Sequence, residues 1–243
     1  MLGGFRANPQ NAAIARRASD HFHNTGRTEQ AIEILKQHTI AAPSSLDLRT
    51  RLGILFFAAK QDAEGETTLK TVLEIHPRMG LAHQALAKFY RLGEKAEPAR
   101  FHAGETLKIR GGSPDDFLKL AAEWLTADRP RDARILLEKA IFDHPTNYEL
   151  ASKLAIAAHR DPEKREFAAR LFREAESLRA IDEKTDPEFL LESAEALISQ
   201  SQSKAAEDRL RAAIRAYPAE AKKRNCQCTA PFGKTLGKRK AKC

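Results

Sequence analysis

Apolar side chains recur along this chain at the spacing of an α-helix. Leu52 and Phe56 stand four residues apart, and Leu69, Val72 and Leu73 repeat at steps of three and four. Residues at this spacing lie on one face of a helix, so these segments predict amphipathic helices. No alternating stretch is long enough to predict a strand. The pattern therefore predicts an all-α fold.

Three kinds of residue also return every 34 positions. The aromatic column is Phe22, Phe56, Tyr90 and Trp124; the loop column is Pro43, Pro77, Gly111 and Pro145; the small column is Ala31, Gly65, Ala99 and Ala133. Three columns in one register predict a repeat array. We expect the small residues to let paired helices approach closely, with an aromatic ring beside each contact. The prolines should end each second helix and extend the residue before them.

The step and the columns resemble the tetratricopeptide repeat (TPR), whose pattern reads W-x2-L-G-x2-Y, then A-x3-F, then P. Leu52, Gly53, Phe56 and Pro77 match it in the second unit. The chain departs from the pattern at the tryptophan, whose place is taken by Ala15, Arg49, His83, Phe117, Ala151 and Leu190. The resemblance implies a right-handed α-solenoid of about six stacked helix-turn-helix repeats.

The 34-residue frame divides the chain into a lead-in, an array of six units and a tail. The predicted segments are 1–11 for the lead-in, 12–45, 46–79, 80–113, 114–147, 148–186 and 187–220 for the array, and 221–243 for the tail. The fifth unit has 39 residues. Helical spacing continues in it from Phe167 through Leu178 to Ile181, so we predict one long helix there instead of a loop.

The net charge of +8 lies in one segment. Residues 1–110 hold 16 Lys and Arg against 11 Asp and Glu, and residues 111–220 hold 17 against 22. The tail, 221–243, has 8 basic residues and no acid, and it contains all three cysteines, Cys226, Cys228 and Cys243. It lacks a helical apolar period, so we predict a disordered basic tail.

A basic tail of this kind favours contact with nucleic acid or an acidic surface. A solvated extension, or a reading-frame change near the end of the gene, would give the same composition. A metal site is not expected, because Cys226-x-Cys228 and Cys243 contain no CxxC pair and the tail has no histidine. No cofactor is expected either.

Neither a secretory leader nor a membrane span is predicted. No apolar h-region precedes a cleavage site. The longest apolar run, 54–59, is far shorter than the roughly 20 residues that a span needs. We therefore take the cytoplasm as the default location.

No residue pattern predicts catalysis. His21 and His23 are two residues apart and would point to different faces of a helix, and His76 and His144 precede equivalent prolines at predicted helix ends. The chain also lacks a glycine-rich phosphate loop, HExxH and GxSxG. We expect a non-catalytic protein.

The TPR resemblance implies that a protein or peptide partner binds in a concave groove lined by the first helix of each unit. Aligning the units gives the predicted groove residues Arg16, Asp20, His23, Asn24, Ile54, Phe57, Gln84, Lys88, Arg91, Leu118, Leu125, Ile156, Leu191, Glu195 and Ile198. Some TPR proteins hold an acidic C-terminal tail with a two-carboxylate clamp. Here Asp20 and Arg51 stand where that clamp has asparagines, which argues against that partner.

Two hypotheses follow. In the first, the chain is a scaffold or adaptor whose groove binds an extended peptide or a partner helix. In the second, the basic tail binds nucleic acid or an acidic surface and the repeats mediate assembly. Leu210, Ile214 and Tyr217 of the last unit would form an uncovered apolar edge, which predicts either a covering molecule, including a second copy, or further chain.

Overall fold

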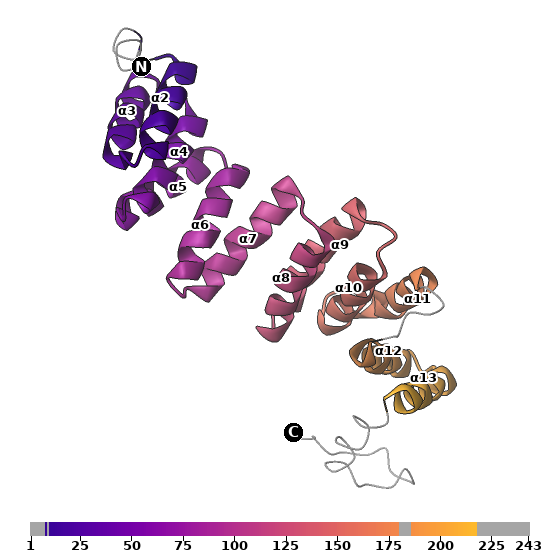
Figure 1. The fold of residues 1–243 in the computed structure, drawn as a ribbon. Helices are drawn as coiled ribbons and strands as arrows, with labels where there is room; N and C mark the ends of the chain where they lie inside the picture. Colours follow the sequence, from indigo (N-terminus) through magenta and orange to yellow (C-terminus); the bar gives the residue numbers. More distant parts are fainter. Residues whose placement is uncertain (1–7, 9, 180–185, 218–243) are drawn as a thin grey trace. The chain divides into compact units, whose positions relative to one another are not determined.

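The computed structural model describes residue 8 and residues 10–179 and 186–217, and within them it contains twelve α-helices and no strand (Figure 1). The helices are α2 (Ala12–Asn24), α3 (Thr28–Ala41), α4 (Leu46–Ala58), α5 (Asp62–Ile75), α6 (Gly80–Leu92), α7 (Ala96–Arg110), α8 (Pro114–Thr126), α9 (Pro130–Asp143), α10 (Tyr148–Arg160), α11 (Ala168–Leu178), α12 (Pro187–Ser199) and α13 (Ser203–Ala216). The all-α prediction is confirmed.

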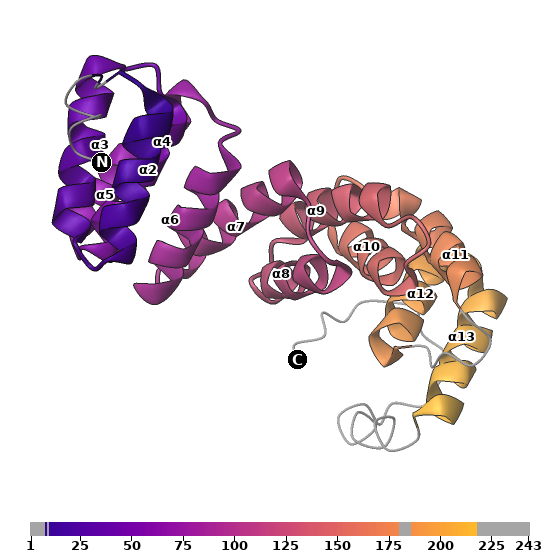
Figure 2. The ribbon, with the colours of Figure 1, turned by 45° about the horizontal axis from the view of Figure 1, so that its top comes forward.

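The helices follow one another as helix-turn-helix pairs, and the chain divides into two compact units, residues 1–150 and 151–243. In the N-terminal unit α2 packs on α3, α4 on α5, α6 on α7 and α8 on α9, and each pair contacts the next (Figure 2). In the C-terminal unit α12 packs on α13 and α11 packs on α12. Consecutive pairing is the arrangement that the 34-residue columns predict.

The turn inside most pairs has a repeated backbone geometry. Gly26, Lys60, Glu94 and Asp128, each 34 residues after the last, have positive φ, and Ser201 repeats the geometry in the last pair. The amide after each of them bonds to a carbonyl five residues back, as from Gln61 to Phe56 at 2.8 Å. This is a Schellman motif, which satisfies the last carbonyls of the first helix and reverses the chain.

A glycine at one of these turns should stabilise the protein. Lys60 has φ 63°, a left-handed conformation in which Cβ is strained. We expect Lys60→Gly to raise the free energy of unfolding by about 0.5–1 kcal/mol, after the greater unfolded-state freedom of glycine is subtracted. Urea denaturation followed by circular dichroism measures it. Lys60→Ala, which keeps Cβ, is the control, and an equal gain there would contradict the explanation.

The three columns pack as the sequence predicts. Phe22, Phe56, Tyr90 and Trp124 are all buried, as are Ala31, Gly65, Ala99 and Ala133. A Cβ added to Gly65 would lie 3.0 Å from the carbonyl oxygen of Gly53 in the partner helix, so the pair requires a small residue there. Between pairs, the Trp124 ring fills the space over Gly104, where an added Cβ would lie 2.4 Å from the ring. Close backbone approach and an adjacent aromatic ring hold neighbouring pairs together.

Each proline of the loop column follows the end of a second helix, as expected. The preceding residues Ala42, His76 and His144 cap α3, α5 and α9 and have ψ of 75°, 85° and 67°, outside the helical region. The His144 ring donates from Nε2 to the carbonyl oxygen of Gly112 at 3.0 Å. This histidine therefore ties its own helix end to the loop of the preceding pair.

The long helix predicted from Phe167 to Ile181 is confirmed only in part: α11 covers Ala168–Leu178, and Arg179 after it is extended. Helix α10 ends at Arg160, a turn and a short 3₁₀ segment (Arg165–Phe167) follow, and α11 has only 11 residues. Pro162 explains why α10 ends before this segment, because proline has no amide hydrogen and disfavours helix at Asp161. The Asp161 carboxylate instead accepts a bond from the amide of Glu163 at 3.1 Å. Ile181, the last residue of that prediction, lies outside the described residues.

Candidate functional site

A shallow hollow of about 680 Å³ lies at the N-terminal ends of the first helices in the N-terminal unit. Its lining comes from the start of α2, the loop and first turn of α4, and the loop before α6: Ala12, Ala13, Arg16, Arg17, Asp20, Ser44, Ser45, Leu46, Asp47, Leu48, His76 and Met79. Arg16 and Asp20 are predicted groove residues. The first helices therefore do form a recess, and its lining includes two arginines and two aspartates.

Positive charge is concentrated beside this hollow. Arg51 of α4 forms an ion pair with Asp20 of α2, which fixes the two helices side by side. Burial and the nearby charge of Arg16 lower the pKa of Arg51. Three arginines, Arg16, Arg17 and Arg51, lie here with two carboxylates, Asp20 and Asp47, so this end of the surface keeps one excess positive charge.

The next first helix, α6, continues this surface next to α4. Gln84 is exposed, and its side-chain oxygen accepts a bond from Arg110 at 2.6 Å. Lys88 and Arg91 are exposed, and neither has an ion pair with the described residues. From here on, the first-helix face means the face formed by Arg16, Arg17, Asp20, Ile54, Phe57, Gln84, Lys88 and Arg91.

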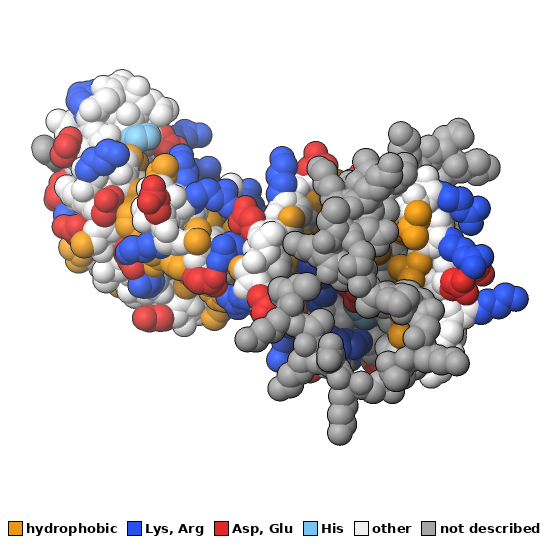
Figure 3. All heavy atoms as spheres, turned by 90° about the horizontal axis from the view of Figure 1, so that it is seen from below, with side chains coloured by type: hydrophobic (Ala, Val, Ile, Leu, Met, Phe, Trp, Pro, Cys, Tyr) orange, Lys and Arg blue, Asp and Glu red, His pale blue; other side chains and the backbone are white. Residues whose placement is uncertain are grey.

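Apolar side chains lie among these charges. Ile54 is 38% exposed, and the half-buried Phe57 ring stacks on Phe89 of α6 with centroids 4.3 Å apart. On α8, Leu118 and Leu125 are half-buried. Figure 3 shows one face of the molecule, on which charges of both signs alternate with apolar side chains. Among the predicted groove residues of α4, α6 and α8, the polar side chains are exposed, and most of the apolar side chains are half-buried against neighbouring residues.

Two other predicted groove residues lie beside the turn that closes the first helix pair. His23 and Asn24 stand at the C-terminal end of α2 and are exposed. The His23 ring meets the Thr28 hydroxyl across the turn at 3.3 Å. His21 and His23 are both exposed at this helix end, as the sequence predicts for two histidines that do not share a face.

One predicted groove residue of the C-terminal unit is not available to a partner. Ile156 is completely buried, so the prediction that it lines an open groove is wrong. The sequence around it, Leu154 to Ala158, is apolar at every position and all of it is buried. A helix that is apolar all round has no open face. Leu191 is half-buried, and Glu195 and Ile198 are exposed on α12.

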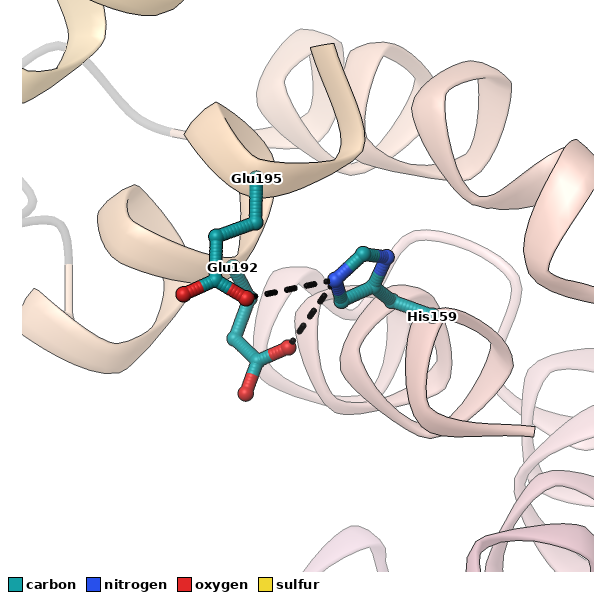
Figure 4. A group of neighbouring side chains, drawn as sticks. All are labelled: His159, Glu192 and Glu195. Carbon is teal, nitrogen blue, oxygen red and sulfur yellow. Dashed lines mark ion pairs between the residues drawn. The ribbon is translucent and has the colours of Figure 1, made fainter. Parts of the chain in front are cut away.

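Glu195 belongs to a cluster that the sequence interpretation did not find. The His159 ring of α10 points toward two carboxylates of α12, with Nε2 3.6 Å from Oε2 of Glu192 and 3.6 Å from Oε2 of Glu195 (Figure 4). The 34-residue repeat register could have indicated His159 as a member of the predicted groove face. His159 follows His23, Phe57, Arg91 and Leu125 at steps of 34 and so stands on the face that lines the predicted groove.

A second polar cluster is buried between α6 and α7. His83 donates from Nε2 to the carbonyl oxygen of Pro77 at 2.9 Å, so its Nδ1 accepts a hydrogen bond from Nδ1 of His102, 2.8 Å away. Burial and the neighbouring His83 lower the pKa of His102 to about 4. Perturbed histidines can mark active sites, but these two close a helix contact.

Near this histidine pair, the Tyr90 hydroxyl donates to Glu66 at 2.9 Å, and Lys70 binds the same carboxylate oxygen at 2.6 Å. The pKa of Glu66 is lowered by its hydrogen bonds with Lys70 and Tyr90. The Tyr90 ring stacks on His102 with centroids 5.6 Å apart. These contacts join α5, α6 and α7, so we assign the whole network to packing of the second and third pairs.

The structure describes the predicted assembly edge on α13 but not the basic tail. On α13, Ile214 is exposed and Leu210 is half-buried, while Tyr217 follows the helix as its cap residue. The tail 221–243, with its three cysteines and its proposed contact to nucleic acid, lies outside the described residues. None of the helices in residues 10–179 and 186–217 has the length and apolar character that a bilayer crossing requires.

No protein-family model and no curated protein sequence matches this chain. Among solved structures, the structure of Naa15/Naa10 bound to HypK-THB aligns with a TM-score of 0.56 at 18% identity, over 87% of this chain and 35% of that chain. This alignment, together with helix pairs repeated every 34 residues around the packed columns, decides the fold. The chain has a TPR-like fold. The resemblance stated from the sequence is confirmed.

Two further solved structures are similar to this TPR-like chain. The crystal structure of YrrB, which is described as a TPR protein with an unusual peptide-binding site, aligns with a TM-score of 0.46 at 13% identity, over 81% of this chain and 99% of that chain. The crystal structure of the MamA protein aligns with a TM-score of 0.41 at 17% identity, over 68% and 90%.

Proposed function

We propose that this TPR-like chain is a non-catalytic protein-interaction scaffold whose first-helix face binds an acidic peptide segment of a partner. The observation that supports this is the distribution of ion pairs in the N-terminal unit. On the second helices α5, α7 and α9, five basic side chains have carboxylate partners in their own helix: Lys70 with Glu66, Arg100 with Glu97, Lys108 with Glu105, Arg134 with Glu138, and Lys139 with Asp143. Two others use different partners: Lys36 lies over the Phe56 ring and Arg110 donates to Gln84.

On the first helices α2 and α6 the arrangement is different. Arg16, Arg17, Lys88 and Arg91 have no carboxylate partner among the described residues, and all four are exposed. Positive side chains that face solvent without a partner leave a positive potential, which attracts acidic segments and raises their association rate. Ile54 and Phe57 lie between the two groups and offer apolar contact. On this surface, the positive charges would favour acidic segments over others, and the apolar side chains would add to the affinity for the bound segment.

Charge reversal on α6 tests this proposal. We expect Lys88→Glu with Arg91→Glu to weaken binding of Glu-rich twelve-residue peptides by about tenfold or more at constant salt, which corresponds to about 1.4 kcal/mol. Fluorescence anisotropy with labelled peptides measures it, and Lys-rich peptides of equal length serve as the reference.

The matched control is Arg173→Glu with Lys204→Glu, which makes the same change in net charge at exposed positions of α11 and α13. This variant should bind the acidic peptides almost as well as the wild type. Equal losses in the two double variants would show that only net charge matters and would contradict a site on the first-helix face. Binding of the Lys-rich peptides in preference to the Glu-rich ones would also contradict it.

A further inference from the structure

His159 is a buried imidazole without hydrogen bonds. It is 7% exposed, and its Nδ1 atom is buried with no hydrogen-bond partner. Its Nε2 atom lies 3.6 Å from each of two carboxylate oxygens, which is beyond hydrogen-bond distance. A buried polar group without partners costs about 1–3 kcal/mol. The ring is therefore directed at two anions without forming a bond to either of them.

The arrangement of these three side chains matches a metal site. Glu192 and Glu195 are three residues apart on α12, so their side chains leave the same face of the helix. One ligand atom from each glutamate and from His159 all lie within 4.8 Å of one another. Zinc bonds of about 2.0–2.2 Å at tetrahedral angles separate ligand atoms by about 3.4 Å. The two measured separations of 3.6 Å are close to that value.

The surroundings hold the ligands in place. Arg160 binds Oε1 of Glu192 through Nε at 2.8 Å and through a terminal nitrogen at 2.6 Å, which leaves Oε2 directed at His159. The Phe172 and His159 rings form a T-shaped pair, with centroids 6.4 Å apart and an interplanar angle of 63°. A hydrogen-bond partner that orients a carboxylate ligand, as Arg160 does for Glu192, is typical of metal sites.

The charge of the cluster also fits a cation. Side-chain ion pairs join three carboxylates, Asp186, Glu188 and Glu192, to two basic groups, Lys153 and Arg160. A fourth carboxylate, Glu195, lies beside them and, among the described residues, contacts only His159. Burial raises the pKa of Glu188, but Lys153 and Arg160 outweigh that effect and leave its pKa below the ordinary value. With the four carboxylates and the two basic groups charged, these six side chains carry two excess negative charges. A divalent ion would neutralise it.

We propose that His159, Glu192 and Glu195 bind a divalent transition-metal ion such as Zn²⁺, which joins α10 to α12. Imidazole nitrogen favours Zn²⁺ and its neighbours over Mg²⁺ or Ca²⁺. The side chain of Glu195 is 70% exposed, so the site opens to solvent on its side. Three protein ligands leave a fourth position for water or for a donor from a bound partner.

Titration of the full chain with Zn²⁺ by isothermal calorimetry tests the site. The cysteines at 226, 228 and 243 are replaced by serine in every variant, because thiols also bind Zn²⁺. We expect one Zn²⁺ per chain, and an affinity at least tenfold lower in Glu195→Gln. That change is on an exposed side chain and should leave the fold intact. Glu207→Gln, on an exposed glutamate of α13, is the matched control and should bind as the parent does.

Cobalt gives an independent measurement. Co²⁺ bound to the cysteine-free chain should give visible absorption bands without sulfur charge transfer, and His159→Asn should remove them. Absence of saturable Zn²⁺ binding up to about 0.1 mM, or equal affinity in the parent and Glu195→Gln, would overturn the proposal. Neither readout involves an acidic peptide, so the outcome is independent of binding at the first-helix face.

Discussion

Replacing Trp124 by alanine should lower the free energy of unfolding of the N-terminal unit by about 3–5 kcal/mol. The ring is 3% exposed, and it fills the space over Gly104 between the third and fourth helix pairs. Its removal leaves a cavity that the surrounding helices can close only in part. Because Trp124 is the only tryptophan of the chain, urea denaturation is followed by far-ultraviolet circular dichroism instead of fluorescence.

Phe142 provides the control for this prediction. It is an aromatic residue on the neighbouring helix α9, but it is 81% exposed. Phe142→Ala should therefore change the free energy of unfolding by no more than about 0.5 kcal/mol. Similar losses in both variants would mean that the contact between pairs at Trp124 and Gly104 does not determine stability.

Acid should destabilise the contact between α6 and α7 through His102. Its pKa in the folded protein is about 4, against an ordinary value of 6.5. Between these values the unfolded chain binds a proton that the folded chain excludes, so stability is fully present above pH 6.5 and declines as the pH falls towards 4. We expect a loss of about 2 kcal/mol over this range. Unfolding by urea at a series of pH values measures it.

His102→Asn separates this effect from other titrations. Asparagine can donate to His83 from nearly the same position as Nδ1 but does not titrate, so the decline between pH 6.5 and 4.5 should become smaller. The charged groups that act on His102 are Lys70, which lowers its pKa, and Glu105, which raises it. Carboxylates with lowered pKa values, such as Glu66, destabilise the fold only at more acidic pH. An unchanged pH dependence in His102→Asn would contradict the assignment.

The sequence predicts the helix pairs because the same packing requirement returns every 34 residues. Phe56 and Gly65 belong to the aromatic and small columns, which predict a close helix contact in each unit where they recur. The structure confirms this contact. The turns are a different case. Gly26 is the only residue of its column in the first four pairs that signals positive φ, since Lys60, Glu94 and Asp128 are ordinary surface residues by type. Backbone geometry there is set by the two helices that the turn connects.

The candidate sites show where one-dimensional patterns fail. The prediction for Ile156 followed the repeat register alone, although the apolar run around it favours burial. The helix of the fifth unit was predicted to reach Ile181 from apolar spacing alone, although the chain becomes extended at Arg179. His159 was missed because its partners come from the next pair, and the 39-residue unit interrupts the step that would have aligned them.

The positive-φ turns also provide two equivalent positions between which a distance can be measured. Lys60 in the N-terminal unit and Ser201 in the C-terminal unit occupy the same place in the same backbone motif, and both are exposed. Spin labels attached through cysteine at these two positions, in a chain without its natural thiols, would report from equivalent points on two compact units. A change in the distance between them on addition of a peptide or of Zn²⁺ would measure how binding at one unit reorients the other.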